Sequence, residues 1–265
     1  RHCFMDLLSI HYYVIPGDWE HKGSATDFTE EEYYTTIRKA YKMDEILTRN
    51  SEILDKYDKN NDIMFAVDEW GCWLDVEEGT NPGFLYQQNT MRDALVASVT
   101  FDIFNSHSDR VKIACIAQMV NVLQAVCITD KEKMILTPTY HVFNMYKNHQ
   151  EALPLITECE NIPILSVDSE EIKAISSSIS ESEDGSINIS LTNISLSDDY
   201  EVEISINGMN KSDISASILS AEMDDYNTFD NPDNVCIKDY SGYTLINGTI
   251  TVKLPKTSIV NIMVR

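Results

Sequence analysis

The side chains best placed for chemistry lie in the segment VDEWGCW, residues 67–73. Asp68 and Glu69 come at the end of an apolar, strand-like run, and Trp70 and Trp73 follow at once. A carboxylate at the C-terminal end of a parallel strand lies where α/β folds build active sites, and it can act as a nucleophile or as a general acid or base. Flat indole rings suit the apolar faces of sugars. The pattern alone leaves open a plainer interpretation, in which the carboxylate caps a helix or pairs with a lysine.

Alternation along this run predicts which side chains share a face. Successive residues of a strand point to opposite sides, so Ile63, Phe65, Val67 and Glu69 are expected together, facing inward in a barrel. Asp68 is expected on the opposite face, which argues against it as a makeshift acid.

Polar side chains at the ends of two other strand-like runs are candidate partners of Glu69. In LLSIHYYV, His11 and Tyr13 share a face near the C-terminal end. In VKIACIAQMV, Gln118 shares a face with Ala114 and Ile116, and it could hydrogen-bond a sugar hydroxyl or orient a carboxylate. A histidine satisfied within the core and a glutamine that hydrogen-bonds backbone are the alternatives.

Helix-like segments separate these runs in the first 150 residues. The sequence Thr29-Glu30-Glu31-Glu32 fits a capping box, so a helix is expected to follow it. A second helix is expected around residues 91–103 and a third around 139–149. Buried strands joined by long helices are typical of a parallel sheet. A complete eight-stranded (β/α)₈ barrel takes about 250 residues, so the three strand candidates form either a small open sheet or the end of a barrel.

Residues 151–265 change to short alternating runs rich in Ser, Asn, Ile and Asp. The apolar residues of the 187–191 run fall on one side, with Asn188 and Ser190 on the other. Such alternation, with Asn-Gly turns, predicts an antiparallel β-sandwich. The serine-rich stretch 176–186 is interpreted as a loop between strands.

Charge and composition exclude several classes of function. The net charge of −23 argues against nucleic acid, whose binding needs clustered Lys and Arg, and against an anionic membrane surface. No run approaches the roughly 20 apolar residues of a membrane span. G-x-S-x-G, P-loop and H-E-x-x-H motifs do not occur, which argues against the functions that those motifs support. The six cysteines lack metal-ligand spacing. Most lie in apolar context, so we expect them to be reduced and buried in a reducing compartment.

Several motifs, in order along the chain, resemble those of a known family. These motifs are SIHYY, VDEWGCW, Q-x-N-T-M-R-D-A-L-V-A, HSDRVKIACIAQMVNVLQA and LTPTYHVFNMYKNHQ. They are similar to consecutive motifs of family 51 glycoside hydrolases, the α-L-arabinofuranosidases, over residues 9–150. Residues 151–265 match by position and character. The resemblance implies an α/β plus all-β fold: the last three βα units of a (β/α)₈ TIM barrel over 1–150, followed by an antiparallel β-sandwich (jelly roll) over 151–265.

The resemblance also implies a function and a site. It implies a retaining hydrolase, free of metal and cofactor, that releases terminal α-L-arabinofuranosyl residues from arabinose-containing polysaccharides or oligosaccharides. Glu69 matches the catalytic nucleophile. Residues that match substrate-binding positions of the family are His11, Tyr13, Trp73 and Gln118, and Trp19 lines the pocket. Gly71 stands where many relatives have Asn, which is interpreted as a minor change.

The family's acid/base glutamate belongs to a strand that precedes the first one here. These 265 residues do not include that strand, so the chain alone is expected to be inactive. The resemblance further implies a cytoplasmic location and a possible homo-oligomer. The alternative is a non-catalytic carbohydrate-binding or remnant protein. A binding module is expected to expose Trp or Tyr on a sheet face, and residues 151–265 contain no Trp.

Overall fold

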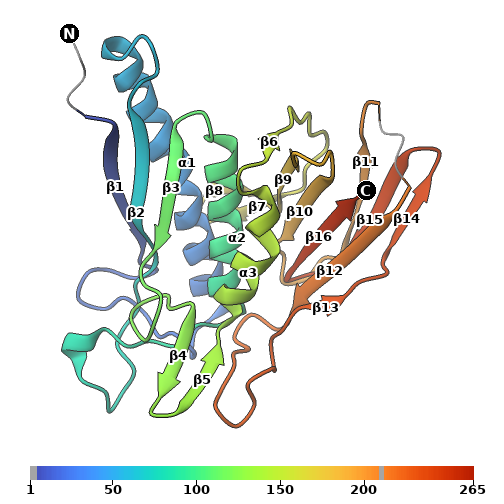
Figure 1. Cartoon of the computed structure of the whole chain (residues 1–265). Helices are drawn as coiled ribbons and strands as arrows, with labels where there is room; N and C mark the ends of the chain where they lie inside the picture. The colour runs from blue at the N-terminus through green and yellow to red at the C-terminus, as the bar shows by residue number, and fades with distance from the viewer. Residues whose placement is uncertain (1–4, 209–211) are drawn as a thin grey trace.

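The computed structural model describes residues 5–208 and 212–265, so Cys3 lies outside the described residues. Figure 1 shows a layer of helices between a small parallel sheet, at the N-terminal end of the chain, and a pair of antiparallel sheets. Among the described residues, none of the helices has both the length and the hydrophobicity of a membrane span.

The parallel sheet contains β1 (Leu7–Val14), β2 (Met64–Cys72) and β3 (Val111–Ile116) in that spatial order. Both neighbouring pairs are parallel, as the alternation of strands and helices predicts. The third run was expected to extend to residue 120, but β3 ends at Ile116 because the following backbone turns into hydrogen bonds within a loop.

Long helices connect these strands. The helical elements are α1 (Glu30–Tyr57), the short 3₁₀ turn η1 (Pro82–Phe84), α2 (Met91–Ser106), α3 (Pro138–Tyr146) and η2 (Lys147–His149). The expected third helix at 139–149 is therefore an α-helix that tightens into a 3₁₀ turn for its last residues, a common end for a helix.

The capping box predicted for the first helix is present. The Thr29 side chain accepts from the Glu32 backbone amide, and the Glu32 carboxylate accepts from the Thr29 amide at 2.7 Å. Two amides that lack partners inside the helix are thereby satisfied. The helix then buries residues spaced three and four apart, namely Tyr33, Thr36, Ile37, Ala40, Met43 and Leu47.

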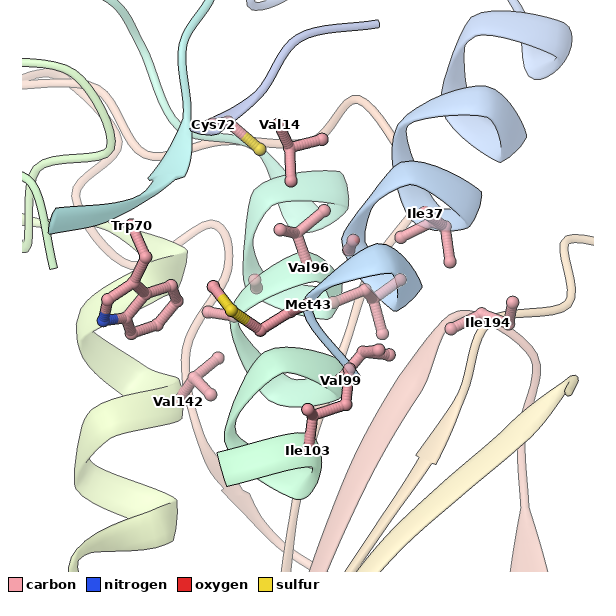
Figure 2. Close-up of a cluster of buried hydrophobic side chains, with 14 of the residues drawn as sticks. Val14, Ile37, Met43, Trp70, Cys72, Val96, Val99, Ile103, Val142 and Ile194 are labelled. Carbon is pink, nitrogen blue, oxygen red and sulfur yellow. The ribbon is translucent and has the colours of Figure 1, made fainter. Parts of the chain in front are cut away.

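The main hydrophobic core lies between the parallel sheet and the helices (Figure 2). Trp70, on β2, points into it and packs edge-on against Phe101 and Phe104, with centroid distances of 5.3 Å to each. Side chains from beyond residue 150, including Ile194 and Leu219, belong to the same core. The described residues therefore cover the parallel sheet on one side only, the side that faces the helices.

Two hairpins lie outside the larger sheets. They are formed by β4 (Cys127–Asp130) with β5 (Lys133–Leu136), and by β7 (Ile164–Val167) with β8 (Glu170–Lys173). The second hairpin contacts α1 through the ion pairs of Arg38 with Asp168 and Glu170.

The antiparallel strands form two facing sheets. The six-stranded sheet has the order β13-β12-β16-β10-β9-β6 and the three-stranded sheet the order β11-β15-β14. The bounds are β6 (Leu153–Pro154), β9 (Ile175–Glu181), β10 (Ile187–Asn193), β11 (Tyr200–Ser205), β12 (Ile214–Ser220), β13 (Lys238–Asp239), β14 (Tyr243–Ile246), β15 (Thr249–Leu254) and β16 (Ser258–Val264). A second apolar core lies between them.

The antiparallel prediction is confirmed in its details. Ile187, Ile189 and Leu191 belong to the core between the sheets, as their alternation predicts. The Asn247-Gly248 pair, with φ of +52° and +83°, forms the two-residue turn between β14 and β15, as expected for a hairpin turn that needs positive φ.

Two interpretations of composition are wrong. The serine-rich stretch is not a loop, because most of it belongs to strand β9. Ser176 and Ser178 of this strand donate to Asp102 on α2, a contact that composition alone does not reveal. The cysteines are free, but of the described ones only Cys72 is buried. Cys115 and Cys159 are exposed, the former because it lies on the face of β3 that the helices do not cover.

Candidate active site

The C-terminal ends of β1 and β2 bring Glu69 and its expected partners together. His11 is the register partner of Glu69, and Tyr13 is that of Gly71. The Tyr13 hydroxyl donates to Oε2 of Glu69 at 2.5 Å, and His11 Nδ1 lies 3.7 Å from the same oxygen. Of the four side chains expected to converge, these three do so, on the face of the sheet opposite the helices.

A β-bulge, rather than simple alternation, produces this arrangement. The pairing of β1 with β2 shifts register between Ser9 and His11. Phe65 and Val67 lie in the core on the helix side, as Trp70 does, so the alternation changes parity between 67 and 70. The predicted grouping of Ile63, Phe65 and Val67 with Glu69 is therefore wrong. A bulge opposes two residues to one, so alternation fails across it.

The same bulge places Asp68 beside Glu69, not on the opposite face. Ser9 Oγ donates to Asp68 Oδ1 at 2.7 Å, and His11 Nε2 lies 3.1 Å from that oxygen. His11 thus lies between two carboxylates. The hydrogen bond from Ser9 holds the pKa of Asp68 below its usual range, and the nearby imidazole acts in the same direction.

Tyr13 is a durable hydrogen-bond donor to Glu69. Burial raises the pKa of the phenol, and the hydrogen bond to the Glu69 carboxylate raises it further. The hydroxyl therefore keeps its proton at neutral pH, and its direction fixes one carboxylate oxygen. The Glu69 side chain is 48% exposed, so the other oxygen has room to meet a ligand.

Aromatic rings form a wall beside the carboxylate. Trp73 packs edge-on against Tyr13, at 5.1 Å between centroids, and against Trp19, at 5.2 Å. The Lys22 ammonium lies 5.1 Å from the Trp19 ring and 5.6 Å from the Trp73 ring, within the range of a cation–π contact. Asp75 accepts from the backbone amide of Lys22 and so holds this loop in place.

Gln118 is close to the strand ends but does not join the hydrogen-bonded group. It follows the end of β3, and its side chain is exposed and forms no hydrogen bond with any of the described residues. Ala114 and Ile116 pack against the core on the helix side. Gln118 does not continue their alternation because the strand ends before it.

A different glutamine, Gln124, hydrogen-bonds the backbone that follows Glu69. Gln124 is fully buried; its Oε1 accepts from the Cys72 amide at 2.7 Å, and its Nε2 donates to the Asp93 carbonyl at 2.7 Å. Gln87 similarly accepts from the Leu74 amide at 2.8 Å. These side chains hold the backbone that continues β2 from Glu69 to the aromatic wall.

The glycine at position 71 is required by the backbone conformation and is not a minor change from Asn. Its φ is +128°, a conformation that L-residues with a Cβ rarely adopt. A Cβ there would lie 3.0 Å from Oε1 of Gln124 and 3.2 Å from its Cβ. In this chain the position requires glycine.

Sequence reasoning missed Gln124, Gln87 and the placement of Asp68. The bulge could not be located from the sequence, because its position depends on how β2 pairs with β1. The VNVLQA segment that contains Gln124 was part of a recognised motif, but its apolar surroundings gave no reason to choose that residue. Within residues 5–208 and 212–265, no group of three or more His, Cys, Asp or Glu side chains could hold a metal ion.

Comparison with known proteins identifies relatives for nearly the whole chain. Residues 68–258 match the family model described as the alpha-L-arabinofuranosidase C-terminal domain. An intracellular exo-α-L-arabinofuranosidase of Bacteroides ovatus is 42% identical over 97% of the chain and 50% of that relative. An intracellular exo-α-(1→5)-L-arabinofuranosidase of Halalkalibacterium halodurans is 28% identical over 48% of the chain and 25% of its own length.

Solved structures also match the chain over nearly its whole length. The family 51 arabinofuranosidase of Xanthomonas axonopodis pv. citri superposes with a TM-score of 0.95 at 42% identity, over 99% of the chain and 53% of that protein. An α-L-arabinofuranosidase of Thermotoga maritima, in complex with arabinose, has a TM-score of 0.77 at 22% identity, over 97% of the chain and 52% of that protein, and so shows likeness of fold.

Parallel βα units followed by antiparallel sheets are the architecture that the chain shares with the solved family 51 glycoside hydrolase. The family-model match and the identity to the Bacteroides ovatus relative make the assignment specific. The chain belongs to family 51, the α-L-arabinofuranosidases. It spans about half the length of the curated relative from Bacteroides ovatus.

Proposed function

We propose that this chain supplies the nucleophile side of a retaining α-L-arabinofuranosidase active site, with Glu69 as the nucleophile. The hydrogen bond from Tyr13 to Glu69 Oε2 carries the proposal, since it orients a half-exposed carboxylate at the strand edge where α/β enzymes react. The names of the relatives supply the substrate class, arabinose-containing glycans.

In the proposed reaction, Glu69 Oε1 attacks the anomeric carbon of a terminal arabinofuranose. The bond to the leaving oxygen breaks while a second carboxylic acid gives that oxygen its proton. A covalent ester forms, and water hydrolyses it with the second group acting as base, so configuration is retained. Tyr13 holds Oε2 and so leaves Oε1 facing the sugar. No step of this scheme requires a metal or cofactor.

Trp73, Trp19 and His11 serve substrate binding in this proposal. The ring of Trp73 offers a flat apolar surface at the side of the carboxylate, and Trp19, 67% exposed, extends that surface outward. His11 lies within 3.7 Å of Glu69 and presents polar atoms toward the same space. The exposed Gln118 amide lies near the strand ends and has no side-chain hydrogen bond to the described residues, so it is available to a sugar hydroxyl.

The acid is not supplied by the carboxylates next to Glu69. Asp68 shares its face, but the Ser9 hydrogen bond lowers the pKa of Asp68, whereas a general acid needs a raised one. Asp75 is engaged by the backbone amides of Lys22 and Gly23. We therefore propose that the acid/base glutamate comes from the part of the relatives that these 265 residues do not match, and that the chain alone is inactive.

The open side of the sheet supports the same proposal. Parallel sheets are normally covered on both faces, yet Leu7 and Ile113 are 40% and 41% exposed on β1 and β3. We propose that residues 1–150 are the last three βα units of a (β/α)₈ barrel and residues 151–265 a jelly-roll sandwich. The name of the Bacteroides ovatus relative supports a cytoplasmic location.

Complementation tests this proposal. The purified chain, shown to be folded by circular dichroism, is assayed with an aryl α-L-arabinofuranoside, alone and together with the half of the Bacteroides ovatus relative that it does not match. We expect no turnover from either part alone, and turnover from the mixture or the fused polypeptide. Turnover that is unchanged by Glu69→Gln would show that Glu69 is not the nucleophile.

A further inference from the structure

A buried polar layer joins the helices to the six-stranded sheet, and one acid lies at its centre. Asp102, on α2, is 6% exposed. Its carboxyl accepts from Ser176 Oγ at 2.6 Å, Ser178 Oγ at 2.6 Å and the Tyr146 hydroxyl at 2.8 Å. The two serines belong to β9 and the tyrosine to α3. Three elements that are distant in sequence therefore converge on one carboxyl group.

No cation accompanies this acid among the described residues. The titratable groups that face it are Tyr41 from α1 and Tyr146 from α3, both neutral phenols, and its remaining hydrogen-bond partners are two serine hydroxyls. A carboxylate enclosed without a positive partner is costly, so burial favours the protonated form. Burial raises the pKa of Asp102 to about 7, although the three hydroxyl donors act in the opposite direction.

A histidine occupies the same layer nearby. His149, in η2, is 8% exposed; its Nδ1 lies 2.8 Å from Ser180 Oγ and its Nε2 lies 2.9 Å from Ser190 Oγ. Its ring lies 5.5 Å from the ring of Tyr146, and no acid faces it among the described groups. Burial lowers the pKa of His149 to about 4. A neutral imidazole suits the two hydroxyls, which can each donate or accept.

We propose that this layer is an uncharged junction at mildly acidic pH, in which Asp102 is protonated and His149 is neutral in the folded chain. A protonated carboxyl can donate to one of the surrounding hydroxyls while its other oxygen accepts from the rest. The junction then holds the βα units against the antiparallel sheets without any buried charge. This inference concerns the fold and stands independently of the proposed catalytic role.

Linkage between protonation and folding gives the junction a distinctive signature. In the unfolded chain Asp102 ionises near its ordinary pKa of 3.8, so its contribution to stability is lost as pH rises from about 4 to 7. The unfolded His149 gains a proton below its ordinary pKa of 6.5, so its contribution is lost as pH falls from 6.5 to about 4. Where the two pH ranges overlap, the contributions of Asp102 and His149 to stability change with pH in opposite directions and so offset each other.

Single substitutions separate the two effects. The unfolding equilibrium constants of the chain, Asp102→Asn and His149→Gln are measured in urea from pH 5 to 8. The ratio of the unfolding constant of the unsubstituted chain to that of Asp102→Asn should rise about tenfold per pH unit up to pH 7 and then level off. Relative to His149→Gln, the unsubstituted chain should lose stability as pH falls below 6.5. Asp109→Asn, which removes an exposed acid just beyond α2, controls for loss of charge and should show neither slope.

A comparison with Asp102→Asn that is flat from pH 5 to 7 overturns the proposal, because Asp102 would then be ionised in both states. Where Asp102→Asn does not fold, the carboxyl ¹³C resonance of Asp102 in the unsubstituted chain decides the same question. That resonance should keep the position of a protonated carboxyl until pH approaches 7. A resonance already at the ionised position at pH 5 contradicts the inference.

Discussion

Tyr13 and Glu69 join the ends of two adjacent parallel strands by a 2.5 Å hydrogen bond, although they are not register partners. The bulge in β2 makes this possible, because it turns Asp68 and Glu69 to the same face while Trp70 stays in the core. The nucleophile proposed here is therefore aimed by a local irregularity of the strand.

Loss of the Tyr13 hydroxyl should impair catalysis without unfolding the chain. A hydrogen bond to a charged group contributes about 1.5–3 kcal/mol, so Tyr13→Phe should lower kcat/KM by roughly 10- to 150-fold in the complemented enzyme. Tyr12→Phe is the matched control, since the Tyr12 hydroxyl donates to the Lys39 carbonyl on the helix side. Equal losses in the two variants would argue against a specific role for Tyr13.

Gly71 should tolerate no side chain. Gly71→Ala forces a Cβ into a backbone with φ of +128° and against Gln124, so we expect a loss of at least about 2 kcal/mol in the free energy of unfolding. Gly79→Ala is the control, because Gly79 also has positive φ, +81°, but its Cβ would meet open space. That substitution should cost about 1 kcal/mol from backbone strain alone. Urea denaturation measures both, and a Gly71→Ala chain as stable as Gly79→Ala would contradict the contact with Gln124.

The two glutamines near the strand ends should behave in opposite ways. Gln124→Ala leaves the buried Cys72 amide without its acceptor and removes a donor to the Asp93 carbonyl, which should cost roughly 1–3 kcal/mol of stability. Gln118→Ala changes an exposed side chain, so its effect on stability should stay within about 0.5 kcal/mol. Thermal or urea unfolding of the two variants checks this. A Gln118→Ala chain that unfolds as readily as Gln124→Ala would refute the distinction.

Much of the fold follows from local patterns that obey strict rules. The capping box at Thr29 fixes the start of α1, and the Asn247-Gly248 pair fixes a hairpin. Alternation along 187–191 correctly separates the apolar and polar faces of β10. Each of these depends on residues close together in sequence, so the sequence carries their physical cause.

The parts that sequence could not predict depend on long-range contacts. The bulge at Asp68 arises from pairing with β1, more than 50 residues away in the chain. The polar serines of β9 resemble a loop until Asp102 is placed opposite them. Gln124 looks like one polar residue in an apolar run, and only the fold shows that it holds the end of β2.

Azide rescue of Glu69→Gly tests the central claim, that Glu69 is the nucleophile, most directly. The variant, combined with the complementary half of the Bacteroides ovatus relative, is incubated with an aryl α-L-arabinofuranoside with and without azide. Removal of the nucleophile opens the face of the sugar that Glu69 would attack, so azide should restore turnover and yield the inverted, β-configured arabinofuranosyl azide. Absence of rescue, or an α-configured azide as expected when the acid/base group is lost, would contradict the assignment of Glu69.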